Sequence, residues 1–371
     1  MTMQNHLFDA LEPRRMMSAA LSGTTLNLRG TPQADNFSVR RAGSQIIVER
    51  NGAREGKFAF AKVQRISIVL GDGNDKLESA GRLPRMMVDA GNGNDSVQTS
   101  VGADFVNGGA GNDVINTFGG DDTVDPGAGN DAVAGGTGIN TLDYSSRTAP
   151  VDVNLEAGRT SENGETDNFE SFSIARGGAG NDTLTGTPKS INSLFGNGGN
   201  DTLTAKGADD ELYGGAGNDT LVDAYGSTLL DGGDGIDTAD YFHSDHTFGV
   251  GVTLNGMGTQ LNARGEYDQL VDCEALLGTA FPDVLIGSDA NDLINGEGGA
   301  DSIIGHAGVD TLLGGDGNDY IEDKDGAIDQ IDGGAGTDFA SPDFVTFPFG
   351  RTSTDTLTSI ESVGDPKGIV F

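Results

Sequence analysis

The chain has 371 residues, with 60 glycines, no tryptophan and 6% aromatic side chains, and its 57 acidic residues against 22 Lys and Arg give a formal net charge of −35. This charge argues against a nucleic-acid partner, because phosphate binding requires a basic face, and it favours cations. A single cysteine excludes an intrachain disulfide framework, and no apolar run of about 18 residues predicts a transmembrane segment.

Residues 1–22 differ from the rest and predict a targeting segment or a disordered tail. They lack the charged-then-apolar order of a classical signal peptide. The string LEPRRMMSA at 11–19 resembles the LEPR-XLL motif, a short N-terminal element of some large bacterial surface proteins. Met16 and Met17 stand where that motif usually has leucines. The resemblance implies export or attachment at the cell surface.

Residues 23–69 predict a β-rich cap at the N-terminal end of the fold. The stretches LNLRG, NFSVRRAG, QIIVER and VQRISIVLG are apolar-rich, and Gly, Asn and Pro turns separate them. This region holds a large share of the basic residues. The ends of a repetitive β structure have to be covered, which is the role we expect here.

A nine-residue period begins after the cap and dominates the chain. Sixteen units lie in register at 90–143, 196–240 and 278–322; position 4 is Gly in thirteen of them, position 6 is Asp in fourteen, and position 8 is Val, Ile or Leu in fifteen. Further units lie at 70–78, 177–185, 324–332 and 333–341. The repeats therefore form three blocks, 70–145, 177–241 and 278–341.

Each unit predicts a turn followed by a very short strand. Position 8 alone is reliably apolar, so we expect it to point inward while positions 7 and 9 point outward. Gly at position 4 suits a backbone with positive φ. Asn is frequent at position 5, for example Asn112 and Asn218, and we expect it to adopt the left-handed conformation, which Asn tolerates best among non-glycine residues.

Stacking such units explains why a cation is needed. Successive coils, about 4.8 Å apart, bury their position-8 side chains on one another but also align their position-6 carboxylates. A hard cation between turns would remove this repulsion. Ca²⁺ accepts six to eight oxygen ligands in flexible geometry, and carboxylates from two turns with carbonyls of a glycine-rich loop can supply them. The alternative for these aspartates is Asx-turn chemistry without a metal.

The units resemble the RTX (hemolysin-type) calcium-binding repeat, G-G-x-G-x-D-x-U-x. The resemblance implies an all-β parallel β-roll or β-helix solenoid in which two units make one coil, so that unit n stacks on unit n+2. It also implies that the position-6 aspartates bind Ca²⁺. These are Asp75, Asp95, Asp104, Asp113, Asp122, Asp131, Asp182, Asp201, Asp210, Asp219, Asp237, Asp283, Asp292, Asp301, Asp310, Asp319 and Asp338.

Some units depart from the repeat and predict weakened sites. Asn140 and Thr228 replace the aspartate at position 6, and Phe281 and Pro282 interrupt the turn before Asp283. The turns of Asp122, Asp210 and Asp329 are also degenerate. We expect the column that contains Asp210 and Thr228 to bind cations weakly or not at all.

Three segments outside the blocks resemble one another. Residues 146–176, 242–277 and 342–371 contain alternating stretches, VDVNL, VGVTL and FVTF, followed by the acidic-apolar stretches DNFESFSI, DQLVDCEALLG and DTLTSIESVG. They predict two β inserts and a C-terminal β segment, with longer strands that pair beside the repeats.

Other candidate sites carry less support from the sequence. His243 and His246, with Asp240 and Asp245 nearby, allow a zinc site, although histidines also occur in ordinary loops. Cys273 lies in LVDCEALL, which favours a buried structural thiol over a reactive one. The sequence contains neither HExxH nor GxSxG, so it lacks the signatures of a zinc metalloprotease and of a nucleophile elbow.

We therefore expect a non-enzymatic, calcium-binding structural or adhesive protein that is secreted or held at the cell surface. Its partners would be calcium ions and, at the surface, polysaccharide or other proteins. The alternative is a polysaccharide-active lyase, epimerase or hydrolase that carries the repeats as a folding and export module. Lys and Arg are nearly absent from the repeats, with Lys206 as an exception, which disfavours lyase chemistry on them.

Overall fold

The computed structural model describes residues 18–207, 209–224, 226–243, 248–254, 259–261, 266–342, 344–347, 350–353, 356–365 and 369–370. The chain divides into two compact units, Met1–Gly138 and Ile139–Phe371, and each is described by itself. Most of the LEPR-XLL-like string, residues 11–17, lies outside the described residues. In the described part the helical content is a single 3-10 turn, Phe60–Lys62, and no helix there is long and apolar enough to cross a membrane.

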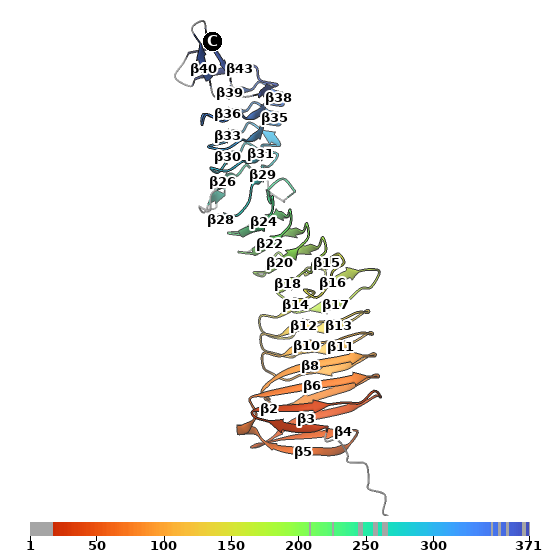
Figure 1. The fold of residues 1–371 in the computed structure, drawn as a ribbon. Helices are drawn as coiled ribbons and strands as arrows, with labels where there is room; N and C mark the ends of the chain where they lie inside the picture. Colours follow the sequence, from red (N-terminus) through yellow and green to blue (C-terminus); the bar gives the residue numbers. More distant parts are fainter. Residues whose placement is uncertain are drawn as a thin grey trace, which may run out of the picture. The chain divides into compact units, whose positions relative to one another are not determined.

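The first unit consists of two ladders of strands, and consecutive coil strands alternate between them (Figure 1). The first ladder runs, in order of pairing, through β1 (Ala19–Ser22), β2 (Thr25–Arg29), β6 (Arg65–Asp72), β8 (Arg85–Asn92), β10 (Phe105–Asn107) and β12 (Thr123–Asp125). The second runs through β5 (Ala53–Ala59), β4 (Gln45–Arg50), β3 (Asn36–Ala42), β7 (Lys76–Ala80), β9 (Ser96–Gln98), β11 (Val114–Asn116) and β13 (Ala132–Ala134).

The three-residue strands bury one aliphatic side chain each, as position 8 predicts. Val97 of β9 pairs in parallel with Ile115 of β11, which pairs with Val133 of β13. The three side chains are between 0% and 3% exposed, while their strand neighbours are partly or fully exposed. Unit n therefore stacks on unit n+2, as the resemblance implied, and the fold is the all-β stack of short parallel strands that the sequence predicts.

The N-terminal strands are longer and pack differently from the coils. Strands β3, β4 and β5 form an antiparallel meander, and β5 is at the N-terminal end of the first unit (Figure 1). Strand β3 buries Phe37 and Val39, and β4 buries Ile46, Ile47 and Val48; all five are between 0% and 7% exposed. This region therefore has an apolar core denser than that of the coils.

The second unit repeats the arrangement with more coils (Figure 1). One ladder runs through β16 (Arg159–Glu162), β15 (Val151–Asn154), β19 (Thr183–Thr185), β21 (Thr202–Thr204), β23 (Thr220–Val222), β25 (Thr238–Asp240), β29 (Ala275–Leu277), β31 (Leu293–Asn295), β34 (Thr311–Leu313), β37 (Gln330–Asp332) and β42 (Thr356–Thr358). A short strand, β17 (Asn168–Glu170), pairs with β16.

Two consecutive ladders supply the other strands of these coils. The first contains β14 (Thr141–Asp143), β18 (Ile174–Arg176), β20 (Ser193–Gly198), β22 (Glu211–Ala216), β24 (Leu229–Asp234) and β28 (Glu266–Val271), with β27 (Thr259–Leu261) antiparallel to β28. The next contains β26 (Gly251–Thr253), β30 (Val284–Ile286), β33 (Ser302–Ile304), β36 (Tyr320–Glu322), β39 (Phe339–Ser341), β43 (Ser362–Asp365) and β44 (Ile369–Val370). Small sheets are formed by β32 (Gly298–Gly299), β35 (Asp316–Gly317) and β38 (Ala335–Gly336), and by β40 (Phe344–Phe347) and β41 (Gly350–Ser353).

The alternating stretches of the inserts enter the ladders instead of only lying beside them. The stretch VDVNL forms β15, which pairs in parallel with the coil strand β19 and carries the antiparallel hairpin partner β16 on its other side. The stretch VGVTL forms β26, which pairs in parallel with β30. Val153 and Val252 occupy the buried place of position 8 in their coils. Each insert thus continues the stack.

The turns confirm one expectation about the backbone and correct another. Gly93, Gly111 and Gly129 at position 4 have φ of 132°, 131° and 131°, as predicted. The asparagines at position 5 are not among the non-glycine residues with positive φ, so the left-handed conformation expected for them is wrong. They serve a different purpose: the backbone N–H of Asn112 donates to Oδ1 of Asn94 in the preceding coil (2.9 Å), and the N–H of Asn130 donates to Oδ1 of Asn112 (2.9 Å).

Candidate metal centres

All seventeen aspartates predicted as calcium ligands lie inside the stack. Their exposed fractions range from 0% at Asp122 and Asp237 to 4% at Asp292. Each one directly precedes the first residue of a strand, because position 6 is the last residue of the turn and position 7 is the first of the strand. Carboxylates are seldom this buried unless they are paired or hold a metal.

A repeated hydrogen bond arranges the aspartates in columns. The backbone N–H of Asp75 donates to Oδ1 of Asp95, 20 residues later (2.7 Å), and Asp95 donates in the same way to Asp113, which donates to Asp131 (both 2.7 Å). The same bond, at 2.7–2.9 Å, links Asp104 to Asp122, Asp182 to Asp201, Asp219 and Asp237 in turn, Asp283 to Asp301, Asp319 and Asp338 in turn, and Asp292 to Asp310 and then Asp329.

The second carboxylate oxygen is left without a protein donor in most of these residues. Oδ2 is buried and accepts no hydrogen bond in Asp75, Asp95, Asp113, Asp201, Asp219, Asp237, Asp301, Asp310, Asp319 and Asp338. A buried polar atom without a partner is costly, and more so when it is charged. A row of such oxygens, one per coil, is the donor set that a hard divalent cation prefers.

The glycine at position 1 explains how these oxygens face the next coil. A Cβ at Gly314 would lie 2.5 Å from Oδ2 of Asp319, in the same unit, and 2.5 Å from the carbonyl oxygen of Gly333, in the next coil. The same pair of oxygens, from Asp301 and from the carbonyl of Gly314, faces Gly296. A side chain at Gly296 or Gly314 would fill this space, so these two glycines keep a carboxylate oxygen and a carbonyl oxygen close together. These residues fit a calcium ion.

Burial raises the pKa of the carboxylates in the metal-free chain. Loss of solvation is the main cause of the rise to about 7 at Asp95, Asp201 and Asp301, and the neighbouring aspartates of the same column add to it. Loss of solvation also raises the pKa of Asp113 to about 6. In the absence of cations, protons therefore bind to these carboxylates near neutral pH, and they compete with any cation that is added.

Four predicted ligands differ because the protein satisfies both of their oxygens. One is Asp210, whose Oδ1 accepts the N–H of Asn192 (2.8 Å) and whose Oδ2 accepts the N–H of Lys206 (3.3 Å); the other three are Asp283, Asp182 and Asp292. Oδ1 of Asp283 accepts the N–H of Val250 (2.6 Å), and its Oδ2 accepts the N–H of Thr279 (2.6 Å). Asp182 and Asp292 also accept a backbone N–H on Oδ2, from Gly178 and Ser288 (both 2.5 Å). These three stand at the beginning of a run of repeats, and Asp283 is the site that Phe281 and Pro282 placed in doubt.

The column of Asp210 is interrupted in the way the sequence predicts. Asn192 occupies the preceding place and donates its N–H to Oδ1 of Asp210 (2.8 Å). Thr228 occupies the following place, where its N–H donates to Oδ1 of Asp268 (2.9 Å) and its buried hydroxyl has no hydrogen-bond partner. The weaker cation binding expected for this column stays a prediction.

The columns end on acidic residues that sequence reasoning missed. The N–H of Asp237 donates to Oε2 of Glu274 (3.0 Å), and the N–H of Asp338 donates to Oε2 of Glu361 (2.7 Å). In the first unit, the column that contains Asp75 begins at Asp35, whose N–H donates to Oδ1 of Asp75 (2.7 Å). Glu274 and Glu361 lie in acidic-apolar stretches that recur after the blocks, and this recurrence was the available signal.

The remaining candidate sites lie outside these columns. Nδ1 of His243 is 2.7 Å from Oδ2 of Asp240, and the His243 side chain is 67% exposed; His246 and Asp245 lie outside the described residues. Within the described part, no third metal-ligating side chain joins this pair. Cys273 is half-buried, and burial raises the pKa of its thiol to about 12, which favours the structural interpretation.

The comparison with protein families supports the same interpretation. The profile of the RTX calcium-binding nonapeptide repeat matches residues 89–142, 174–187, 190–222 and 277–340 in overlapping copies. No match was found among curated proteins. All of the predicted calcium ligands except Asp75 and Asp237 lie in the matched residues. The chain thus carries RTX calcium-binding nonapeptide repeats over much of its length, folded as a β-roll.

Proposed function

We propose that this chain is a structural or adhesive protein of the cell surface or exterior, that it completes its fold by binding Ca²⁺, and that it is not an enzyme. The observation that carries the proposal is the row of buried Oδ2 atoms without donors, one per coil, at Asp95, Asp113, Asp201 and Asp301 among others. A chain with a net charge of −35 does not stack these carboxylates without counter-ions.

The calcium ligands would be the position-6 carboxylates together with carbonyl oxygens of the turns. When bound, Ca²⁺ would supply positive charge at the points where carboxylate columns and glycine carbonyls converge. The protein itself sets the geometry of the sites. Oδ1 fixes the register of each coil through the N–H that it accepts, and glycines such as Gly296 and Gly314 leave space beside Oδ2.

The exterior location follows from the concentration of the ion. Extracellular calcium-binding modules typically have Kd values of roughly 10⁻⁴–10⁻³ M, so they would be empty in the cytosol and loaded outside. Binding to the folded state alone adds its free energy to the stability of the fold. RTX resemblance adds that such chains are typically exported, which agrees with folding delayed until the ion is available.

Two experiments test the role. An antibody against the chain should label intact cells of the producing organism, and a chelator wash should release the antigen; labelling that appears only after lysis would overturn the exterior location. Purified chain at saturating Ca²⁺ should leave polyuronates and other acidic polysaccharides uncleaved. Calcium-dependent turnover of any of them would replace this proposal by the polysaccharide-active enzyme.

A further inference from the structure

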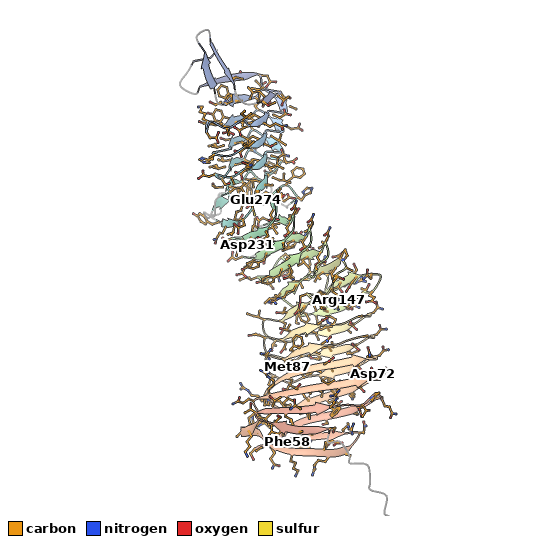
Figure 2. All side chains as sticks on the ribbon, in the orientation of Figure 1. Phe58, Asp72, Met87, Arg147, Asp231 and Glu274 are labelled. Atoms are coloured by element: carbon orange, nitrogen blue, oxygen red, sulfur yellow. The ribbon has the colours of Figure 1, made fainter. Side chains whose placement is uncertain are left out.

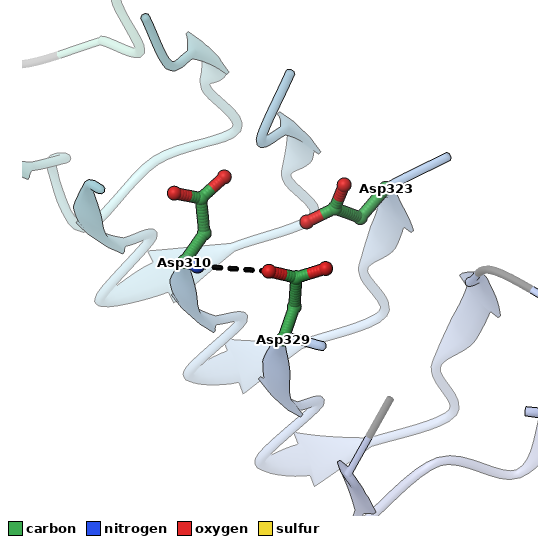
Figure 3. Close-up of side chains that lie close together, drawn as sticks. All are labelled: Asp310, Asp323 and Asp329. Atoms are coloured by element: carbon green, nitrogen blue, oxygen red, sulfur yellow. Dashed lines mark hydrogen bonds between the residues drawn. The ribbon is translucent and has the colours of Figure 1, made fainter. Parts of the chain in front are cut away.

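Three buried carboxylates converge in the second unit, and they form the one such cluster found among the described residues. Asp310, Asp323 and Asp329 each present a carboxylate oxygen, and these oxygens lie within 4.8 Å of one another (Figure 3). Their exposed fractions are 1%, 1% and 2%. Two of the three belong to one column, because the N–H of Asp310 donates to Oδ1 of Asp329 (2.8 Å). The third comes from a different position of the repeat.

Asp323 stands where the repeat has its position-1 glycine. It directly follows β36 as Gly305 directly follows β33, and these strands pair in register, Ile304 with Glu322. The backbone keeps the pattern of the repeat, since the N–H of Gly305 donates to the carbonyl of Glu322 (3.1 Å) and that of Asp323 to the carbonyl of Ser341 (3.2 Å). The strand register and these backbone hydrogen bonds are thus those of the repeat, although the turn from Asp323 to Asp329 is one residue longer than the turn from Gly305 to Asp310.

The surroundings of Gly305 show what this side chain replaces. At Gly296 and Gly314 the two oxygens that face the glycine are an aspartate Oδ2 and a backbone carbonyl of the next coil. At Gly305 a Cβ would lie 2.8 Å from Oδ2 of Asp310 and 2.7 Å from Oδ2 of Asp323. A charged carboxylate therefore takes the place of the neutral carbonyl oxygen of the next coil.

Asp310 gives a second indication of a bound ion, separate from the clustering of the three carboxylates. Its Oδ1 accepts the N–H of Asp292 (2.9 Å), whereas its Oδ2 is buried, has no hydrogen-bond partner and faces the carboxylate of Asp323. The nearest lysine in the sequence, Lys324, directs its Nζ to Oε1 of Glu322 (3.4 Å), and both of these side chains are 34% exposed. An unpaired buried carboxylate oxygen beside two further carboxylates is stabilised by a bound cation, and by a proton where no cation is bound.

We propose that Asp310, Asp323 and Asp329 form a three-carboxylate calcium site, and that Asp323 makes it the tightest site of the second unit. This inference rests on the proposed calcium function but goes beyond the repeat, because the additional ligand is a side chain at the place where the neighbouring units have Gly296, Gly305 and Gly314. The affinity of a calcium site rises with the number of charged ligands. The site retains its ion at free Ca²⁺ concentrations at which the two-carboxylate turns have lost theirs.

Calcium binding measured by flow dialysis with radioactive Ca²⁺, over buffered free concentrations from about 10⁻⁷ to 10⁻³ M, tests this directly on the full chain. The wild type should bind one ion at a concentration about ten-fold lower than the remaining ions. Asp323→Asn should remove this first ion and leave the later ones. Asp316→Asn, on the exposed side of β35, is the matched control and should keep it.

Each outcome decides between the two proposals. A wild-type curve without an early single ion overturns the three-carboxylate site, whether or not the variant folds. Superimposable curves for the wild type and Asp323→Asn overturn it as well, although they leave the calcium function intact. A wild-type chain that binds no Ca²⁺ at all overturns the calcium function itself. Circular dichroism at saturating Ca²⁺ shows whether Asp323→Asn has folded before its curve is interpreted.

Discussion

Asp35 and Asp113 belong to the same column, yet the protein treats their charges differently. The carboxylate of Asp35 accepts hydrogen bonds from the N–H and hydroxyl of Thr31 (both 2.8 Å) and from Nδ2 of Asn51 (2.9 Å), and Nη1 of Arg50 is 3.7 Å away. Oδ2 of Asp113 has no protein donor. The N-terminal strands therefore contain their own positive charge, whereas the coils depend on a cation from solution.

The packing of the two regions differs in the same sense. Strand β3 buries two apolar side chains and β4 buries three, while a coil strand such as β11 buries one. Hydrophobic burial is roughly proportional to apolar area, so the N-terminal strands have a source of stability that the coils lack. The comparison predicts that removal of calcium separates the two regions.

The largest expected effect is a regional loss of structure in chelator. Backbone amides of β9–β13 should exchange with solvent within the shortest labelling time after EDTA addition, because the aligned carboxylates repel one another, whereas those of β3 and β4 should stay protected. Hydrogen exchange followed by mass spectrometry measures both regions in one sample. Equal loss of protection in β3, β4 and β9–β13 would break the comparison.

The second largest effect is expected from the removal of one ligand in the middle of a column. Asp301→Ala removes a carboxylate whose Oδ1 and Oδ2 face two successive coils, and it should destabilise the calcium-loaded chain by about 3 kcal/mol, since truncating one partner of a buried charge pair costs 3–5 kcal/mol. The midpoint of a Ca²⁺ titration should rise. Asp316→Ala, on the exposed side of β35, should leave it unchanged, and a shift of the same size in both variants would contradict the column.

At Asp35, in contrast, a substitution should have an effect that does not depend on calcium. Asp35→Asn should destabilise the N-terminal strands by about 2 kcal/mol. Hydrogen bonds to charged groups contribute about 1.5–3 kcal/mol each, and the amide oxygen of the new side chain still accepts some of the hydrogen bonds that the carboxylate accepted. This loss should be the same in calcium and in chelator, as measured by denaturant unfolding of the first unit. A loss present only in calcium would assign Asp35 to a metal site.

Acidification should reveal the raised pKa values of the columns. In chelator the folded state binds protons more tightly than the unfolded chain, because the pKa of Asp95, Asp201 and Asp301 is about 7 in the fold and near 3.8 without it. Its stability should therefore increase as the pH falls from about 7 towards 4. Protons and Ca²⁺ compete for the same oxygens, so the calcium midpoint should be higher at pH 5.5 than at pH 7.5. Circular dichroism at both pH values checks the two signs.

The smallest effect should come from repair of the interrupted column. Thr228→Asp restores a position-6 carboxylate between Asp210 and Asp268, which should lower the calcium midpoint slightly and destabilise the chain in chelator. The backbone of this coil already has the register of the others, because the N–H of Thr228 donates to Oδ1 of Asp268. A higher midpoint would mean that this turn lacks the carbonyl oxygens that complete a site.

The sequence predicts the parts of this structure that depend on a fixed spacing. A strict nine-residue period places Asp95, Asp113 and Asp131 in one column, because two units make a coil. Parts that depend on longer separations could not be predicted. Asp237 meets Glu274 across 37 residues of insert, and no local pattern fixes that register. The conformation of Asn112 was predicted wrongly because asparagine is favoured both in left-handed turns and in rows where the side-chain Oδ1 of one coil accepts the N–H of the next.

The central claim is that, at neutral pH, these carboxylate columns can be stacked only with divalent cations between the coils. Circular dichroism of the purified chain, dialysed against EDTA and checked for residual metal, tests it most directly. We predict a largely disordered repeat region that becomes β-rich on addition of Ca²⁺ and responds little to Mg²⁺, which requires a stricter octahedral geometry. A full β spectrum in EDTA at neutral pH, without retained ions, would contradict the claim.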